Sequence, residues 1–350
     1  MSGSLPRFLL ALTIGGCGGF LFWLLSLPLP WLLGSLSANL IASVSGVGIQ
    51  VPKPVRQMIP VVIGILVGTT FTPEVVAHAA EWIPSLSVTV VYVFLITAIA
   101  QVFCRKVMGM DKITSLFSGL PGGLSEMTLM GEEAGADIRK LTLIHACRVA
   151  WVLFLIPMLL TYVLVATPAP TAAQATLNSW SLTDGLILLA CAAVGYPVAR
   201  LLRIPADKII GPMVLSAALH LSGFINSVPP SELTLIIQIV LGSALGARFA
   251  GGSLREIRKV LTLATMMTIA MMSVTFLTAW GLARWTGLPF EALILALSPG
   301  GIAEMALASL SLGLDPAFVT THHALRLIVI VFIAPFFIRH FVKKAREEAG

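Results

Sequence analysis

Residues 121–129 read PGGLSEMTL and residues 299–307 read PGGIAEMAL, so one motif occurs twice, 178 positions apart. Further residues agree at the same offset, including Gly135 with Gly313, Asp137 with Asp315, Thr142 with Thr320, His145 with His323, Arg148 with Arg326, Gly64 with Gly242 and Gly68 with Gly246. One residue out of step, Pro28 and Gly34 match Pro205 and Gly211. Such self-similarity indicates two related domains, which we place at 7–165 and 183–341.

The composition places both halves in a lipid bilayer. Of 350 residues, 57% are hydrophobic and 11% are charged, with a mean hydropathy of +0.96. Soluble proteins carry about 25% charged residues, and no soluble fold of this length hides so much apolar surface. The net charge of +6 sits in short loops between apolar runs. It therefore acts as an orientation signal, and nucleic acid is not an expected partner.

Each half contains five long apolar runs, which predict an all-α membrane protein. The runs cover about 8–27, 29–47, 57–73, 83–104 and 139–165, then about 184–201, 206–224, 233–250, 260–281 and 318–341. Residues 166–182 form an uncharged external linker, and 342–350 form a cytoplasmic tail. Each Pro-Gly-Gly segment lies between the fourth and fifth run of its half and breaks any helix there.

Loop charges predict that the halves are inserted in opposite orientations. If each Pro-Gly-Gly segment dips into the membrane and returns, every strongly basic loop falls on the cytoplasmic side, together with both termini. These loops contain Arg105, Lys106 and Lys112, then Arg200, Arg203 and Lys208, and then Arg248, Arg255, Arg258 and Lys259. The alternative makes both segments full spans and the halves parallel, and it puts the last two groups outside. We therefore expect ten spans and two re-entrant segments in a bacterial inner membrane.

The glycines of the two motifs predict an anion-binding site. Gly122, Gly123, Gly300 and Gly301 leave unpaired amides at the start of short half-helices, and irregular backbone at membrane depth requires a surrounding cavity or protein. In the alternative reading the glycines only permit close helix packing. Glu126 and Glu304 follow in each motif. Because a carboxylate inside a membrane is expensive, we expect it to carry protons, bind sodium or pair with arginine; a structural salt bridge or an interfacial position is the alternative.

A second polar set lies on the last apolar run of each half. Arg148 and Arg326 fall near the bilayer centre, where each needs a partner, and the motif glutamates are the candidates. The arginines either grip an anionic substrate or lock the motifs in place. His145 and His323 share their helix faces and either relay protons or are satisfied core residues. With Thr142 and Thr320 they suggest the wall of a wet cavity, whereas Asp137 and Asp315 are predicted helix caps.

The duplicated Pro-Gly-Gly motif and the G-x-D-x-x-x-x-T-x-x-x-x-x-R pattern resemble the AbrB family of integral membrane proteins. The resemblance is carried by Pro121, Gly122, Gly123, Gly135, Asp137 and Arg148 and by Pro299, Gly300, Gly301, Gly313, Asp315 and Arg326. Labels in that family include regulator of gene expression and ammonia monooxygenase. The resemblance implies no particular substrate and no catalytic residues.

The sequence predicts a secondary transporter for a small charged solute, proton-coupled through Glu126 and Glu304, with the solute site between the two Pro-Gly-Gly segments. We find no enzyme motif, no metal-ligand spacing and no cofactor site, so an enzyme is not expected. The expected partners are a small-molecule or ion substrate and the bilayer, and a homo-oligomer is left open. A membrane-embedded regulator acting indirectly is the alternative, followed by an ammonia monooxygenase-type enzyme.

Overall fold

A computed structural model describes residues 4–164, 181–225, 227–250 and 254–349. All regular structure in these ranges is helical. Seven of the described helical segments are long and apolar enough to cross a membrane, namely Leu5–Leu24, Ala79–Lys106, Ile138–Tyr162, Leu182–Leu201, Ser231–Phe249, Val260–Thr286 and Pro316–Ile333. The chain is therefore a multi-pass membrane protein, as its composition predicts.

The first half contains α1 (Ser4–Leu24), α2 (Pro30–Val44), α3 (Lys53–Gly68), α4 (Pro73–Ala77), η1 (Ala79–Trp82), α5 (Ile83–Lys106), α6 (Lys112–Gly119), α7 (Leu124–Ala134) and α8 (Ile138–Tyr162). The second contains α9 (Leu182–Leu201), α10 (Asp207–Leu221), α11 (Ser231–Gly246), η3 (Ala247–Phe249), α12 (Leu254–Thr286), α13 (Phe290–Leu297), α14 (Ile302–Leu312) and α15 (Pro316–Ala349).

Every predicted apolar run coincides with a helix, but not every one is a full-length span. The helices α2, α3 and α10 have 15 or 16 residues. At 1.5 Å per residue they are shorter than the roughly 30 Å hydrocarbon layer. Of the ten complete spans expected, seven are therefore found as helices long enough to cross the membrane, and the other three runs form shorter helices.

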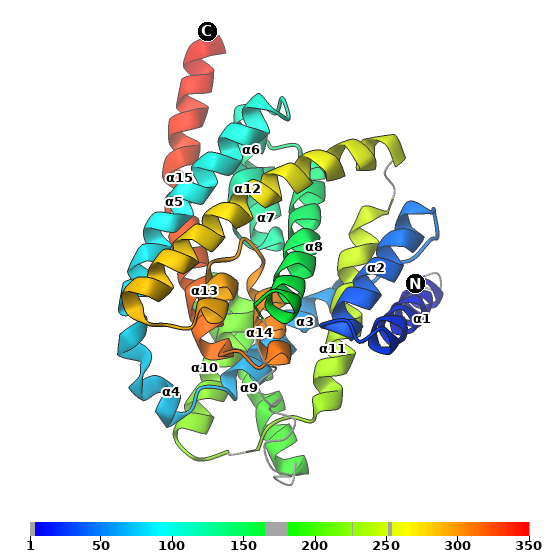
Figure 1. The fold of residues 1–350 in the computed structure, drawn as a ribbon, viewed down its shortest axis with the longest axis vertical. Coiled ribbons are helices and arrows are strands. Elements are labelled where there is room, and N and C mark those ends of the chain that lie inside the picture. Colours follow the sequence, from blue (N-terminus) through cyan, green and yellow to red (C-terminus); the bar gives the residue numbers. More distant parts are fainter. Residues whose placement is uncertain (1–3, 165–180, 226, 251–253, 350) are drawn as a thin grey trace.

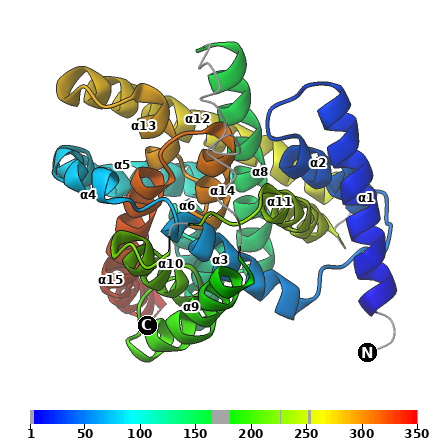
Figure 2. The same ribbon diagram turned by 90° about the horizontal axis from the view of Figure 1, so that it is seen from below.

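Helices from the two halves pack together in two groups. In one group α11 lies against α1 and α2, and in the other α3 lies against α9 and α10 (Figures 1 and 2). Within each group, glycine allows two helix backbones to touch. A Cβ atom on Gly34 would lie 2.2 Å from the carbonyl oxygen of Gly18, and one on Gly211 would lie 2.2 Å from that of Gly195. Small residues at such crossings are what drives helix association in lipid.

The turns that precede α2 and α10 share an unusual backbone. Ser26 and Leu29 have φ values of 53° and 48°, and Arg203 and Ala206 have 56° and 52°. Left-handed backbone is unfavourable for residues with a side chain. The four residues occupy matching positions in the turns before the short helices α2 and α10. The two turns therefore share the same backbone conformation.

Each Pro-Gly-Gly segment separates two short helices. The first segment joins α6 to α7, which both pack against α8, and the second joins α13 to α14, which both pack against α15. In Figure 1, α6 and α7 lie in the upper part of the molecule, and α13 and α14 lie below them, near its middle. The breaks lie between 119 and 124 and between 297 and 302.

Candidate functional site

The first break is held by two side chains of α8. His145 Nε2 donates to the carbonyl oxygen of Phe117 at 2.8 Å. Arg148 Nη1 donates to the carbonyl oxygens of Ser118 and Leu120, each at 3.2 Å. Both side chains are completely buried. They satisfy carbonyl groups that the end of α6 leaves without helical partners.

The second break is held in the same way by α15. His323 Nε2 donates to the carbonyl oxygen of Leu295 at 3.0 Å. Arg326 donates through Nη1 to the carbonyl oxygen of Ser298 and through Nη2 to that of Gly300. The polar anchor is therefore built twice, from residues at matching positions.

Each arginine also orients its histidine. Arg148 Nη2 lies 3.0 Å from His145 Nδ1, and Arg326 Nη2 lies 2.7 Å from His323 Nδ1. Because a guanidinium only donates, Nδ1 must accept, and the ring hydrogen is assigned to Nε2. That nitrogen is the one that donates to the peptide carbonyl.

These contacts correct two expectations about the buried arginines. Glutamates were the expected partners of Arg148 and Arg326, but the structure gives them peptide carbonyls and histidine instead. The expected wet wall is also wrong, because His145, Arg148, His323 and Arg326 are at most 3% exposed. In this structure the four side chains hold the two breaks in place. This is the second of the two roles that the sequence predicted for the arginines, but the bonds go to peptide carbonyls and are not ion pairs.

The motif glutamates fold back onto their own half-helices. Gly123 and Gly301 are the N-cap residues of α7 and α14, and neither helix has a side-chain cap hydrogen bond there. An added Cβ on Gly123 would lie 2.1 Å from Glu126 Oε2, and one on Gly301 would lie 2.1 Å from Glu304 Oε2. The Glu126 carboxylate also accepts a hydrogen bond from its own peptide N–H. A carboxylate thus occupies the positive end of each half-helix.

The other two motif glycines make room for methionine. A Cβ on Gly122 would lie 2.8 Å from the Met127 side chain, and one on Gly300 would lie 2.9 Å from that of Met305. Both methionines are buried. Each Pro-Gly-Gly turn is therefore packed from within its own hairpin.

The two motifs are close enough for their charges to interact. Glu304 is an electrostatic neighbour of Glu126, together with Asp207 and Lys208 at the start of α10.

Arg248 in η3 is a member of this charge cluster that the sequence analysis missed as a site residue. It interacts electrostatically with Glu304 and Glu126, and also with Arg56. Its Nη1 atom is buried and has no hydrogen-bond partner among the residues that the structure describes. The residue at the matching position of the first half is Thr70. In the sequence Arg248 is one of several basic residues between 248 and 259, which all read as orientation signals. The absence of a basic residue at the matching position, Thr70, is the one sequence feature that singles it out.

The two half-helices differ in how deeply they are buried. In α14 most side chains are buried, namely Ala303, Met305, Ala306, Leu307, Ala308 and Ser309, and the helix packs against α3 and α8 of the other half. Among the described side chains of α7, Met127 and Gly131 are buried, and this helix packs mainly against α6 and α8 of its own half. The half-helix α7 is therefore less covered by protein than α14.

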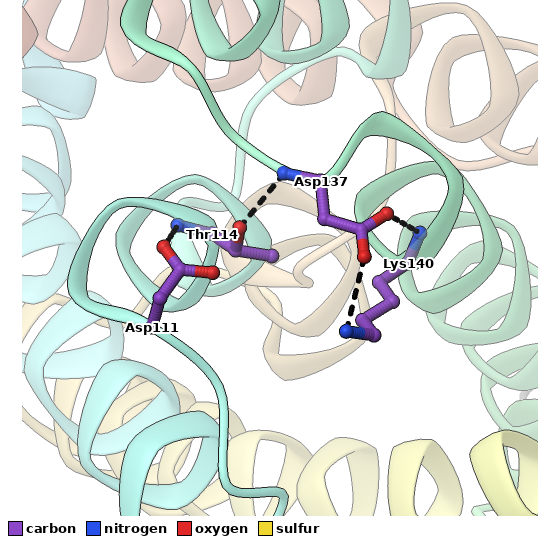
Figure 3. Close-up of polar contacts among 4 residues, drawn as sticks. All are labelled: Asp111, Thr114, Asp137 and Lys140. Atoms are coloured by element: carbon purple, nitrogen blue, oxygen red, sulfur yellow. Dashed lines mark hydrogen bonds and ion pairs between the residues drawn. The ribbon is translucent and has the colours of Figure 1, made fainter.

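Helix caps tie the first hairpin to α8 (Figure 3). Asp111 accepts from the peptide N–H of Thr114 at 2.8 Å, and Thr114 Oγ1 accepts from the peptide N–H of Asp137 at 2.8 Å. Asp137 then accepts from the peptide N–H of Lys140 at 3.1 Å, which lowers the pKa of its carboxyl group. Asp315 accepts from Phe318 in the same way at 3.0 Å. Both predicted caps are confirmed.

Comparison with known proteins places the chain among membrane proteins of one family. The family model described as "Transition state regulatory protein AbrB" matches residues 31–342. The chain is 24% identical over 352 residues to "Uncharacterized protein YhjN" of Bacillus subtilis (strain 168), covering 94% of this chain and 91% of that protein. It is 25% identical over 334 residues to "Putative regulator AbrB" of Escherichia coli (strain K12), covering 95% and 94%. No solved structure matches the chain.

Proposed function

The chain belongs to the AbrB family, and from this premise we propose that it is a secondary transporter of a small charged solute in the bacterial inner membrane. The observation that supports the proposal is a pair of broken helices, each with a glutamate carboxylate folded over its N-terminus, whose charges both interact with Arg248. Charges at membrane depth are expensive, so a cluster of them in a polytopic protein marks a solute or ion path. Broken helices that meet near the midplane are how many secondary transporters bind their substrates.

The proposal includes two inverted repeats with both termini in the cytoplasm. Arg56 at the start of α3 and Arg248 after the end of α11 are electrostatic neighbours, which supports placing both on one side of the membrane. The end of α5, the start of α12 and the end of α15 all lie in the upper part of Figure 1, toward the same end of the molecule. These ends carry basic residues, and parallel halves would separate them across the bilayer.

The unequal burial of α7 and α14 supports alternating access. With the basic ends in the cytoplasm, α7 belongs to the cytoplasmic hairpin, and its greater exposure is what an inward-open state would produce. Exchange of the environments of α7 and α14 would produce the outward-open state. Glu126 and Glu304 are the proposed proton carriers, because each lies at a half-helix N-terminus within the cluster.

A regulator without transport is the second candidate, and it rests on the family description and on the name of the Escherichia coli relative. Regulation by this chain would be indirect, through the solute that it moves or through a cytoplasmic partner.

Topology is tested with cysteines at matching positions, one at the end of α5 and one near the end of α12. Lys106→Cys and Arg284→Cys both replace exposed residues, in a background with exposed Cys17 replaced by serine. A membrane-impermeant maleimide should label the first from the cytoplasmic side and the second from the external side. Labelling of both from one side would overturn the inverted arrangement.

Transport is tested by uptake into proteoliposomes under an imposed pH gradient, with radiolabelled organic acids, phosphate and ammonium as solutes. Uptake above that of empty liposomes supports the proposal, and its loss in Glu126→Gln combined with Glu304→Gln supports proton coupling. Uptake that survives the double substitution rejects the coupling role. No uptake of any solute, together with a cytoplasmic protein that binds the purified chain specifically, would favour the regulator.

A further inference from the structure

A cavity of about 90 Å³ lies between α5, α6 and α15. Nearly all of its wall is apolar, with Leu116 and Leu120 from the first hairpin on one side and Val329 and Ile330 of α15 on another. Water needs two to four polar partners in such a space, so it is not a stable occupant. An empty space would also forfeit the dispersion contacts of the atoms around it. We therefore expect an apolar group to fill the cavity.

The cavity opens on the lipid-facing side of α5. Phe94 and Ala98 line it and are both exposed, Phe94 by 42%. Leu95 and Val102 of the same helix are 49% and 53% exposed, as expected for a membrane-spanning helix at the outer edge of the molecule (Figure 1). An occupant can therefore enter directly from the bilayer.

The size of the cavity restricts what that occupant can be. A drug-sized ligand requires a pocket of about 300–1,000 Å³, whereas this cavity measures about 90 Å³. Only part of a molecule fits inside it. A few methylene groups of a hydrocarbon chain satisfy the size and the apolar wall, while the rest of the chain remains in the bilayer.

A polar and then basic surface continues from the cavity along α5. Gln101 lines the cavity, and Arg105 follows four residues later on the same helix face, about 6 Å along the axis. Arg105 and Lys106 are exposed. Residues 105–112 contain three basic residues and one acidic residue, Asp111, so this end has a net charge of +2. The Gln101 amide can donate to an ester carbonyl, and the basic end attracts a phosphate group.

The second half fills the matching space with its own side chains. At the offset of 178 residues, Phe276 matches Ala98. Phe290 matches Lys112 in the same way. The two phenyl rings pack edge to face with their centres 5.1 Å apart. The first half therefore has a small residue and a basic residue where the second half has an aromatic pair.

We infer that the cavity binds one acyl chain of an anionic phospholipid from the adjacent leaflet, with the lipid phosphate against Arg105 and Lys106. This inference goes beyond the proposed transport function and does not depend on it. The bound chain would contact Leu120, whose carbonyl oxygen accepts a hydrogen bond from Arg148 at 3.2 Å. Lipid binding would therefore stabilise the first Pro-Gly-Gly break in the arrangement that the structure shows.

The test measures phospholipid binding to the purified full-length protein by native mass spectrometry. Dioleoyl phosphatidylglycerol and dioleoyl phosphatidylcholine are the probes, because they have the same chains and differ in net charge. Sodium glycerol phosphate supplies the charged group without chains. The parent protein should bind the anionic lipid about tenfold more tightly than the zwitterionic lipid. It should not bind glycerol phosphate.

Ala98→Phe tests the place of the chain. This substitution adds a ring at the opening of the cavity, so binding of both lipids should weaken by about tenfold or more as methylene groups are excluded. Leu95→Phe is the matched control, because it adds a ring to the same helix outside the cavity and should leave both affinities nearly unchanged. Ala98→Leu replaces Ala98→Phe if that variant does not fold.

Arg105→Gln combined with Lys106→Gln tests the place of the phosphate. The pair should remove the preference for the anionic lipid and keep the binding that depends on the chain. Arg200→Gln combined with Arg284→Gln is the matched control, because both arginines are exposed and belong to other helices. Equal binding of the two lipids by the parent protein, equal effects of Ala98→Phe and Leu95→Phe, or glycerol phosphate binding as tightly as the anionic lipid would overturn the inference.

Discussion

The phenol oxygen of Tyr92 lies 2.6 Å from the hydroxyl oxygen of Thr275, so one hydrogen bond joins α5 of the first half to α12 of the second. Both residues are buried, and Thr275 also donates to the carbonyl oxygen of Met271 at 2.9 Å. Tyr92 is therefore the donor to Thr275. The matching residues are Ala270 and Thr97, and the Thr97 hydroxyl is buried without a partner. A buried hydrogen bond thus joins the halves at the Tyr92–Thr275 pair, whereas the matching Ala270–Thr97 pair cannot form the same bond because alanine has no hydroxyl group.

Tyr92→Phe should destabilise the protein modestly. The substitution removes one buried hydrogen bond but leaves the Thr275 hydroxyl bonded to Met271, so the expected loss is about 1 kcal/mol. Thermal denaturation in detergent measures it as a lower melting temperature. Tyr162→Phe is the control, because that hydroxyl makes an exposed 3.4 Å contact with Ser26 and should matter little. Equal effects of the two substitutions would contradict the assigned role of Tyr92.

Arg326→Lys should impair folding rather than solute recognition. Lysine cannot reproduce the bonds to the carbonyl oxygens of Ser298 and Gly300 together, so at least one buried carbonyl loses its partner. The expected loss of stability is about 1–3 kcal/mol for each such group. Arg148→Lys should behave likewise, because one ammonium nitrogen replaces the two guanidinium nitrogens that bond the carbonyl oxygens of Ser118 and Leu120 and the ring of His145.

The control for these substitutions is Arg200→Lys, whose guanidinium contacts Tyr196 at the exposed end of α9. It should leave the melting temperature nearly unchanged. The readout is the melting temperature together with solute uptake into proteoliposomes. A normal melting temperature with lost uptake in Arg326→Lys would instead make this arginine a solute ligand.

Local features of the fold were readable from the sequence, because their causes lie within a few residues. The ten apolar runs predicted ten helices, and Asp137 and Asp315 predicted two caps, since a cap needs only the residue and the first helical turn. The Pro-Gly-Gly segments likewise predicted the two breaks. The three helices that are too short to span were not foreseen, because apolar loop residues extend their runs in the sequence.

The partners of Arg148 and Arg326 could not be predicted, for a physical reason. Both bond peptide carbonyls about one hairpin away in the chain, and every residue carries a carbonyl group, so no residue type marks the acceptor. A carboxylate was the visible candidate and the wrong one. Arg248 was missed for a related reason. An arginine that belongs to a site and an arginine that orients a loop look the same in the sequence.

Asp137 should make stability depend on pH at the acid end. Its folded-state pKa is lowered, first by the peptide N–H of Lys140 and then by the Lys140 side chain. A lowered pKa means that the cap stabilises the fold above the unfolded-state pKa of about 4 and is lost as pH falls through the folded value. Asp137→Ala should cost about 1 kcal/mol at neutral pH. Because the Asp137 side chain is 38% exposed, the pH step should be small.

Asp137→Asn is the matched control, because asparagine also caps helices but does not titrate. Asp137→Asn should keep most of the stability at neutral pH. Its stability should fall less at acid pH than that of the parent protein, because residue 137 no longer titrates. The measurement is the melting temperature between pH 3 and 7. An identical acid decline in Asp137→Asn and the parent protein would show that other groups cause it.

Two glycines in one turn of α1 provide a last test of the helix packing. A Cβ on Gly18 would lie 2.4 Å from the backbone oxygen of Gly34, whereas a Cβ on Gly16 would meet no atom within 4 Å. Gly18→Ala must therefore push α1 away from α2, at an expected loss of about 1–3 kcal/mol. Gly16→Ala should stabilise the helix by roughly 0.5–1 kcal/mol through its higher propensity. Melting temperatures that move in the same direction would show that α1 and α2 do not touch at Gly18, since helix propensity alone acts equally at both positions.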